Sequence, residues 1–168
     1  RVFALIDDGC NSTCHSVAWA RNAEEKFRKL GLSMLWTSQE SVNFSGIGGG
    51  AKTLGKRRIS VGFLWLNSNT TMDGSFHSHE LEGDGDRANQ PCLLSRNAQG
   101  ILGMVKDMRS GKVTLDGGRE INSYVCASSG LTCICISDFA TKDGKIVFGE
   151  EIDGLRIDAS IHLPDVSP

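Results

Sequence analysis

The sequence predicts a mostly β fold that contains one substantial helix. Twenty glycines stand against three prolines in 168 residues, so tight turns between short segments are expected along the chain. Cysteine and isoleucine alternate over residues 132–137, which is the period of a strand. Residues 15–30, in contrast, carry apolar side chains at helical spacing.

Composition and charge narrow the class of protein. A hydrophobic content of 39% and a charged content of 23% are ordinary for a soluble globular domain. A net charge of −2 does not predict a nucleic-acid partner, and the short basic cluster within residues 52–58 is expected to be solvated. No apolar stretch reaches the ~20 residues that a membrane helix needs, so no membrane partner is expected.

The six cysteines lack the paired spacing of a structural zinc site, so neither a metal nor another cofactor is predicted. Most of them are expected to be buried free thiols, as in a reducing, cytoplasmic compartment. A metal site remains a weaker alternative, because His77 and His79 would share one face of a strand but make only two ligands.

The chain begins with an apolar strand, residues 2–6, that runs directly into Asp7 and Asp8 and then into Gly9. A buried carboxylate is unfavourable without a partner. The two acids are therefore expected on a tight loop at the end of the strand, where Gly9 permits a sharp turn and leaves space beside the acid.

The helix at residues 15–30 follows this loop. Its start can be capped by Ser16 or Thr13, and Gly31 suits the position just after its end. Two acid–base pairs at i,i+4 spacing are expected on its exposed face, Glu24–Arg28 and Glu25–Lys29. The apolar face is predicted to comprise Trp19, Ala23, Phe27 and Leu30.

The rest of the chain reads as short strands separated by turns. Residues 42–66 predict a hairpin with a glycine-rich tip, followed by a turn at 67–75 and a strand at 76–83. A short apolar strand and a short helix are expected within residues 91–105. Further strands are expected near Tyr124 and at 132–137, 145–148 and 155–161, and Asp116 is expected in a turn.

Four segments, taken together, resemble the retroviral-type aspartic proteases, including those of LTR retroelements. An apolar strand ends in Asp-x-Gly and a small residue, a helix ends in Lys-Leu-Gly-Leu, a glycine-rich flap follows, and a second apolar pair precedes Arg-Asn and a short helix. The matching residues are Asp7, Asp8, Gly9 and Cys10, then 29–32, then Gly46, Ile47, Gly48 and Gly49, then Leu93, Leu94, Arg96 and Asn97.

The resemblance implies a retropepsin-like closed β-barrel over residues 1–118. It does not explain residues 119–168, which are expected to form a β-rich extension packed on the same domain. It implies an aspartic endopeptidase of the polyprotein-processing type that acts on a polypeptide substrate as a homodimer. Asp7 of each subunit would supply one carboxylate of a proton-sharing pair. Asn11 and Ser12 match positions that hold the substrate main chain, the flap would cover the peptide, and Arg96 would tie the short helix to the active-site loop.

Two departures from the family stand out. Asp8 occupies the place of a threonine or serine whose hydroxyl braces the two loops across the dimer, and an ionised carboxylate can only accept hydrogen bonds. Two facing copies of Asp8 would repel by about 1 kcal/mol at 4 Å in water. The sequence also begins six residues before Asp7, so it does not include the N-terminal strand and hairpin that precede the catalytic strand in the family, whether by truncation or by divergence. Ser95 replaces a usual glycine.

These departures keep a second interpretation open, namely a binding or assembly module with the retropepsin fold and impaired catalysis. A cysteine hydrolase built on Cys14 and His15 is a weaker alternative, because adjacent side chains point apart.

Overall fold

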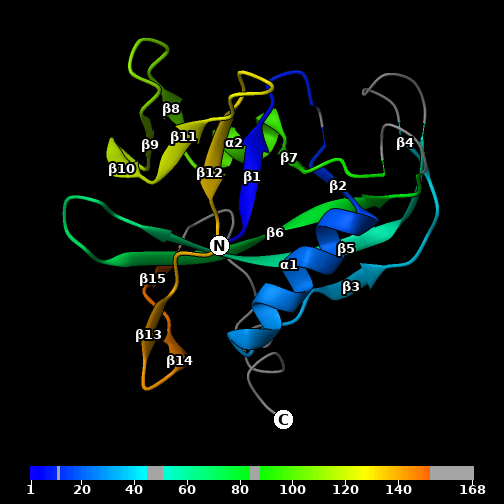
Figure 1. Ribbon diagram of the computed structural model, residues 1–168, viewed down its shortest axis with the longest axis horizontal. Helices are drawn as coiled ribbons and strands as arrows, with labels where there is room; N and C mark the ends of the chain where they lie inside the picture. The colour runs from blue at the N-terminus through cyan, green and yellow to red at the C-terminus, as the bar shows by residue number, and fades with distance from the viewer. Residues whose placement is uncertain (11, 45–50, 84–87, 152–168) are drawn as a thin grey trace.

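The computed structural model describes residues 1–168 except 11, 45–50, 84–87 and 152–168 (Figure 1). The elements in chain order are β1 (Phe3–Ile6), β2 (Cys14–Ser16), α1 (Val17–Lys29), β3 (Leu35–Ser38), β4 (Asn43–Phe44), β5 (Ala51–Leu64), β6 (Thr71–Leu81), β7 (Cys92–Leu94), α2 (Arg96–Ile101), β8 (Val105–Lys106), β9 (Val113–Leu115), β10 (Arg119–Ile121), β11 (Ser123–Val125), β12 (Thr132–Cys135), β13 (Ala140–Lys142), β14 (Lys145–Val147) and β15 (Glu150–Glu151). The protein is therefore mostly β, as predicted.

One large sheet organises the described part of the chain. Its strands follow the order β11-β12-β1-β7-β2-β6-β5-β3, with β15 beside β6 and β4 beside β5. Smaller sheets join β10-β9-β8 and β13-β14. Within the described residues the large sheet is open, since β11 and β3 lie at its two ends, so the prediction of a closed barrel is wrong there. Both end strands are short, with three and four residues, which leaves little backbone to join across the gap.

Strand β1 lies inside this sheet rather than at an edge. It pairs in parallel with β7, with Leu5 opposite Leu93, and antiparallel with β12, with Leu5 opposite Cys133. The strand beside β1 on that side thus comes from residues 119–168. Figure 1 shows the blue β1 between the yellow β12 and the green β7.

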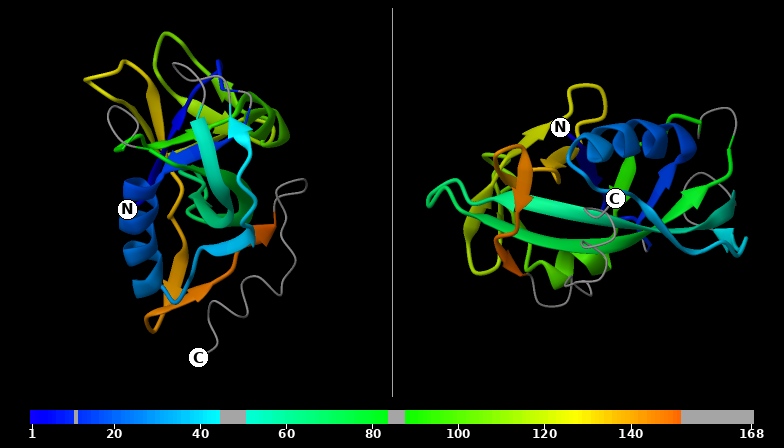
Figure 2. Two further views of the ribbon diagram at one scale, coloured as in Figure 1. Left: turned by 90° about the vertical axis from the view of Figure 1, so that its right-hand side faces the viewer. Right: turned by 90° about the horizontal axis from the view of Figure 1, so that it is seen from below.

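The prediction of a helix after the first loop is confirmed, with its start two residues later than expected. Ser16 is the N-cap, because its Oγ accepts a hydrogen bond from the Trp19 N–H at 3.1 Å. Gly31 has a φ of 79° just after the C-cap Leu30, a left-handed conformation that favours glycine. Both views in Figure 2 show α1 packed along the outside of the strands.

The two predicted i,i+4 pairs on α1 do not form as expected. Glu25 instead pairs with Arg28, one residue before the predicted partner Lys29, at i,i+3. Glu24 reaches across to Arg57 of β5 at 3.4 Å. Tertiary contact with a cation on the neighbouring strand therefore replaces the local pair for Glu24.

A long hairpin of β5 and β6 crosses the whole molecule (Figure 1). The two strands pair from Thr53–Leu81 to Leu64–Thr71. The connecting turn is shorter than predicted, because residues 71–75 already belong to β6. Asn69 takes a positive φ of 58° in that turn, and Trp65 N–H donates to Thr70 O across it.

The apolar side chains form a main core and a smaller second cluster. The main core joins the inner face of α1 to the sheet and contains Phe27, Phe63, Trp65 and Ile134. The second cluster lies on the opposite face of β1 and contains Leu5, Cys10, Cys14, Leu81, Leu93 and Cys133. Neither helix of the described residues is long and apolar enough to cross a membrane.

The C-terminal described segment returns to the β5–β6 hairpin and meets a buried carboxylate there. Asp73 of β6 is 4% exposed, and one of its oxygens accepts a hydrogen bond from the Gly149 N–H just before β15. Its other oxygen, Oδ1, has no hydrogen-bond partner among the described residues. Burial raises the pKa of Asp73 to about 6, and the Gly149 N–H partly opposes this.

Asp73→Asn is expected to remove a pH-dependent loss of stability. In the wild type, the unfolded Asp73 ionises near pH 4 while the folded one holds its proton until about pH 6, so stability falls as the pH rises through this window. The loss amounts to about 2 kcal/mol of the free energy of unfolding. Urea denaturation at pH 4, 5, 6 and 7 measures it for the wild type and the variant.

Asp143→Asn is the matched control for this measurement. Asp143 is exposed in the β13–β14 turn at a φ of 54°, a conformation that asparagine also tolerates. The control should retain the wild-type pH profile. A parallel profile for Asp73→Asn and the wild type would contradict the assignment to Asp73.

Candidate active site

Asp7 lies where β1 ends and the chain turns out of the sheet. The parallel pairing of β1 with β7 continues to Ile6 and Leu94, and the Asp7 N–H then points to Leu94 O at 3.5 Å. The Cys10 N–H donates to Asp7 O at 3.1 Å, which closes a turn. Asp7 is half-buried, whereas Asp8 and Gly9 are exposed.

The carboxylate of Asp7 is held by its own loop. Its Oδ1 accepts a hydrogen bond from the Gly9 N–H at 2.9 Å. Gly9 lies in this turn, as predicted, but it is not among the glycines with a positive φ, so the turn does not depend on the left-handed conformation that favours glycine. A Cβ at Gly9 would lie 3.4 Å from Asp7 Oδ1, which is an ordinary van der Waals contact, so a small side chain would also fit beside the acid.

Strand β1 is buried on both faces, which explains why its residues are apolar up to the two acids. Ala4 and Ile6 face the main core, and Leu5 faces the second cluster on the other side of the sheet. A strand covered on both faces is apolar at every position. Asp7 is the first residue beyond this cover, so its carboxylate reaches the surface at the end of a rigid element.

Backbone hydrogen bonds brace the loop from two other elements. The Arg96 N–H donates to Cys10 O at 3.0 Å, which ties the start of α2 to the loop. The Ser95 N–H donates to Thr13 Oγ1 at 3.0 Å. Cys10 itself is 2% exposed and its Sγ donates to Ser12 O at 2.8 Å. These bonds hold the Asp7 loop between β2 and α2.

The second apolar motif supports the site through its main chain and its cap. Leu93 and Leu94 are buried beside β1. Ser95 caps α2 by accepting from the Ala98 N–H at 3.2 Å, which gives a physical role to the residue that replaces the usual glycine. Gln99 Nε2 donates to Leu94 O at 3.0 Å.

Thr13 and Gln99 are supporting residues that the sequence reasoning missed as such. The sequence signals only the cap: Ser95 stands immediately before the short predicted helix, where a serine is a typical N-cap. Arg96 and Asn97 are exposed on α2, and the bond from Arg96 to the loop is made by its backbone N–H.

Several predicted site residues lie outside the described residues. These are Asn11 and the flap residues Gly46, Ile47, Gly48 and Gly49. The strands that flank the flap residues do pair antiparallel, with Asn43 opposite Lys52. Ser12 is exposed beside Asp7's loop.

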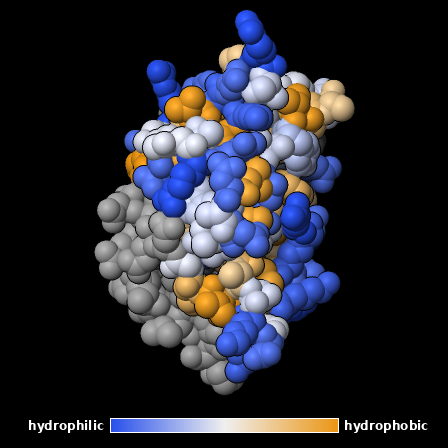
Figure 3. Space-filling model, turned by 90° about the vertical axis from the view of Figure 1, so that its left-hand side faces the viewer, coloured by the Kyte–Doolittle hydropathy of each residue, from blue (hydrophilic) through white to orange (hydrophobic). Residues whose placement is uncertain are grey.

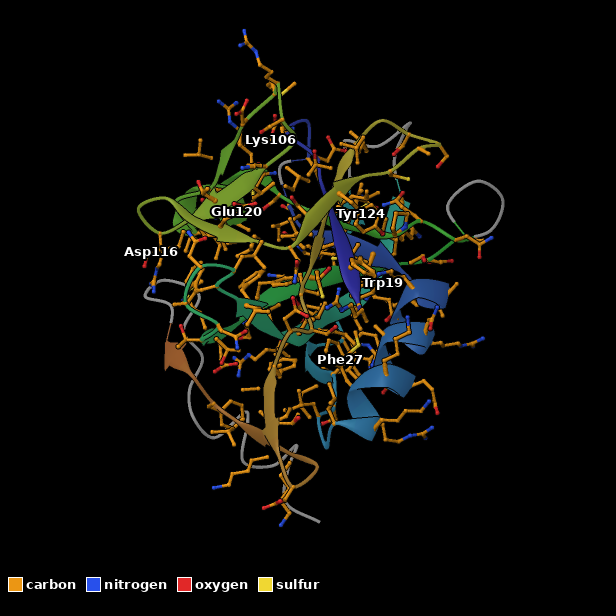
Figure 4. All side chains as sticks on the ribbon, turned by 60° about the vertical axis from the view of Figure 1, so that its left-hand side comes forward. Trp19, Phe27, Lys106, Asp116, Glu120 and Tyr124 are labelled. Atoms are coloured by element: carbon orange, nitrogen blue, oxygen red, sulfur yellow. The ribbon has the colours of Figure 1, made fainter. Side chains whose placement is uncertain are left out.

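The other Asp-x-Gly of the chain is a turn, as predicted. Asp116 has a φ of 44°, pairs with Arg119 at 2.6 Å and connects β9 to β10. Figure 4 shows its side chain at the periphery of the molecule, well away from β1. Asp116 therefore does not join Asp7 in one site.

A buried polar network occupies the interior between β2, β6 and β5. His15 Nδ1 lies 2.7 Å from Ser78 Oγ, and His15 Nε2 lies 3.1 Å from Glu80 Oε1. Arg57 Nε lies 3.0 Å from the same Glu80 oxygen. Burial lowers the pKa of His15, and the hydrogen bond to Glu80 opposes this, so His15 is neutral at neutral pH.

This network contains serine, histidine and glutamate in contact but is unsuited to hydrolysis. Ser78 and His15 are 0% exposed and Glu80 is 3% exposed, so a substrate cannot reach the hydroxyl. The ring nitrogens are also reversed relative to a hydrolytic triad, in which Nε2 faces the serine. Both nitrogens of His15 are engaged, which also removes the base that Cys14 would need.

The cysteines are free thiols, as predicted, and five of the six are buried. Hydrogen bonding to Cys10 and burial raise the pKa of Cys14, and burial raises that of Cys92, so both stay protonated. In the part of the chain that the structure describes, no three His, Cys, Asp or Glu side chains are placed to hold one metal ion. Arg58 Nε lies 3.3 Å from His77 Nε2, which places a cation beside that proposed ligand.

The chain was also compared with known proteins. No protein-family model matches it, and no curated protein and no solved structure matches it either.

Proposed function

We propose that this chain is one subunit of an aspartic endopeptidase that cleaves polypeptides as a homodimer. The observation that carries the proposal is the position of Asp7. It is an anchored, solvent-facing carboxylate at the end of a doubly covered strand, on a loop held by β7, Thr13 and the start of α2. This is the combination of rigidity and access that a catalytic carboxylate requires.

The proposed chemistry needs two copies of Asp7. Two carboxylates about 3 Å apart cannot both ionise easily, so they share one proton. The ionised member takes a proton from a water molecule that attacks the scissile carbonyl carbon, and the protonated member donates a hydrogen bond to the carbonyl oxygen. Because Asp116 lies in a remote turn, the second carboxylate comes from Asp7 of another chain.

A pH-resolved digest tests the proposal directly. The full chain is incubated with a peptide library between pH 4 and 7, with and without a statine-type inhibitor, and the products are identified by mass spectrometry. We expect inhibitor-sensitive cleavage that is faster at acidic pH, where one proton per pair is retained. Failure to cleave at any pH would instead favour the binding or assembly module.

Asp8→Thr is expected to strengthen dimerisation and increase peptidase activity near neutral pH. The Asp8 carboxylate is exposed next to Asp7, and a second copy close to the two-fold axis repels it. Removing a repulsion of about 1 kcal/mol tightens the dimer roughly fivefold. Sedimentation velocity and the peptide assay measure the two effects.

Asp8→Asn is the matched control, because it removes the charge without adding a hydroxyl. A gain in both variants assigns the effect to charge, and a gain in Asp8→Thr alone assigns it to the hydroxyl bridge. If neither variant gains dimer or activity, the explanation of Asp8 as the weak point of the site is incorrect.

A further inference from the structure

Four large apolar side chains are exposed at the end of the molecule that carries the Asp7 loop. They are Ile101 at the end of α2, Val105 in β8, Met108 in the β8–β9 turn and Val125 in β11, here called the end patch. Their exposed fractions are 42%, 63%, 83% and 53%. In Figure 1 and in the left view of Figure 2, the β1–β2 connection and the β8–β9 turn lie at this same upper end.

Within the end patch, Val125 lies beside the turn that carries Met108. The Val125 side chain lies against Gly111, at 3.5 Å from the position of a Cβ there, and Ser123 Oγ donates to Gly111 O at 3.3 Å. Gly111 closes the turn that carries Met108, because its N–H donates to Asp107 O at 2.8 Å. Figure 3, which shows the left-hand side of Figure 1, has hydrophobic side chains among charged ones near its upper end.

The turn under Met108 is ordered before any partner arrives. Asp107 Oδ1 accepts a hydrogen bond from the Arg109 N–H at 2.9 Å, and the Asp107 N–H donates to Lys112 O at 2.9 Å. Covering Met108 would bury apolar surface, which favours association. Because the turn is already ordered, its backbone would lose little conformational entropy on binding.

The short distance between the end patch and the Asp7 loop indicates that the partner is a second copy of this chain. The Arg96 N–H bonds the Asp7 loop, and α2, with six residues, is only about 9 Å long, so Ile101 lies one short helix away from the loop. In the proposed function, two Asp7 side chains meet at about 3 Å across a two-fold axis. Surfaces that surround Asp7 at this end must then face the second copy, and a two-fold axis pairs the same patch on both chains.

Charge at this end suits a self-complementary contact. It carries Asp7 and Asp8 together with Lys106 and Arg109, and no ion pair engages any of these four within the described residues. A two-fold arrangement can place the cations of one chain against the acids of the other around an apolar centre. Figure 4 shows Lys106 at the upper end of the molecule.

We propose that the end patch is the surface through which two copies of this chain associate, with Met108 and Val125 covered in the dimer. The proposal rests on the proposed function for the choice of a second copy as the partner. The proposed interface is formed by α2, the β8–β9 turn and β11, and not by the ends of the chain.

Sedimentation velocity over a concentration series tests the patch on the full chain. Met108→Asp and Val125→Asp each place a carboxylate in the apolar contact and should raise the dimer Kd at least about tenfold. Val147→Asp is the matched control, since Val147 is 47% exposed on β14 at the opposite end, and it should leave the Kd unchanged. Thermal melts of all three variants verify folding.

The possible results distinguish a failure of the end-patch proposal from a failure of the proposed peptidase function. A wild-type dimer that both patch variants weaken supports the patch even if no peptide is ever cleaved, in which case the proposed function fails alone. A wild type that stays monomeric at the highest soluble concentration overturns the patch, as does a dimer that the patch variants and Val147→Asp leave equally stable. Where a dimer persists in the patch variants, peptidase activity that depends on Asp7 would persist too, and the proposed function would stand without the patch.

Discussion

Asp7→Asn is expected to reduce peptidase activity by about 10²- to 10⁴-fold while the fold is retained. An amide in place of the carboxylate cannot take a proton from the attacking water, and a pair of such amides cannot share one. The Asn oxygen can still accept the hydrogen bond from the Gly9 N–H, so the loop keeps its internal contact. Initial rates of peptide cleavage between pH 4 and 7, with circular dichroism of both proteins, measure the effect.

Asp116→Asn is the matched control for this substitution. Asp116 is the other aspartate of the described residues that is followed by x-Gly, it is exposed, and asparagine suits its positive φ. Its activity should equal that of the wild type. Equal loss in both variants, or full activity in Asp7→Asn, would remove Asp7 from the catalytic role.

Glu80→Ala is expected to destabilise the protein by about 3 to 5 kcal/mol in the free energy of unfolding. Glu80 is 3% exposed, and its Oε1 lies 3.1 Å from His15 Nε2 and 3.0 Å from Arg57 Nε. Removing it leaves the Arg57 cation without this counter-charge and the buried His15 ring N–H without its acceptor, which costs much more than the pairs contribute. Urea denaturation at pH 7 gives the difference.

Glu82→Ala is the control for the loss of a glutamate at this end of β6. Glu82 follows the strand and is exposed, so its removal should change stability by less than about 0.5 kcal/mol. If Glu80→Ala is as stable as Glu82→Ala, Arg57 and His15 are satisfied by other groups. The network would then not be the strong structural element inferred from the geometry.

Local features of this protein were predictable because their causes are local. The apolar face, the Ser16 cap and the Gly31 stop of α1 follow from side chains within one or two helical turns. The turn at Asp116 follows from two glycines after a strand. In contrast, the Glu24–Arg28 pair failed because Arg57, 33 residues away, competes for Glu24.

The candidate site divides in the same way. That an apolar strand ends in Asp7 and Asp8 is readable from nine consecutive residues, and so is the expectation that one of them faces solvent. That Gly9 has no positive φ and that a Cβ there would make only an ordinary contact with Asp7 Oδ1 is visible only in the conformation of the loop. Thr13 is polar and unremarkable in sequence, yet it receives the Ser95 N–H from 82 residues away.

By itself, the sequence of this protein determined that the chain is mostly β, where its one long helix lies and which acids end the first strand. Only the tertiary structure decided that β1 lies between β7 and β12, that His15 meets Ser78 and Glu80, and that exposed apolar residues gather at the Asp7 end. The physical reason is that periodicity specifies which face of a strand is apolar but not which strand covers it. Pairing partners are selected by the packing of the whole chain, over separations that no local pattern records.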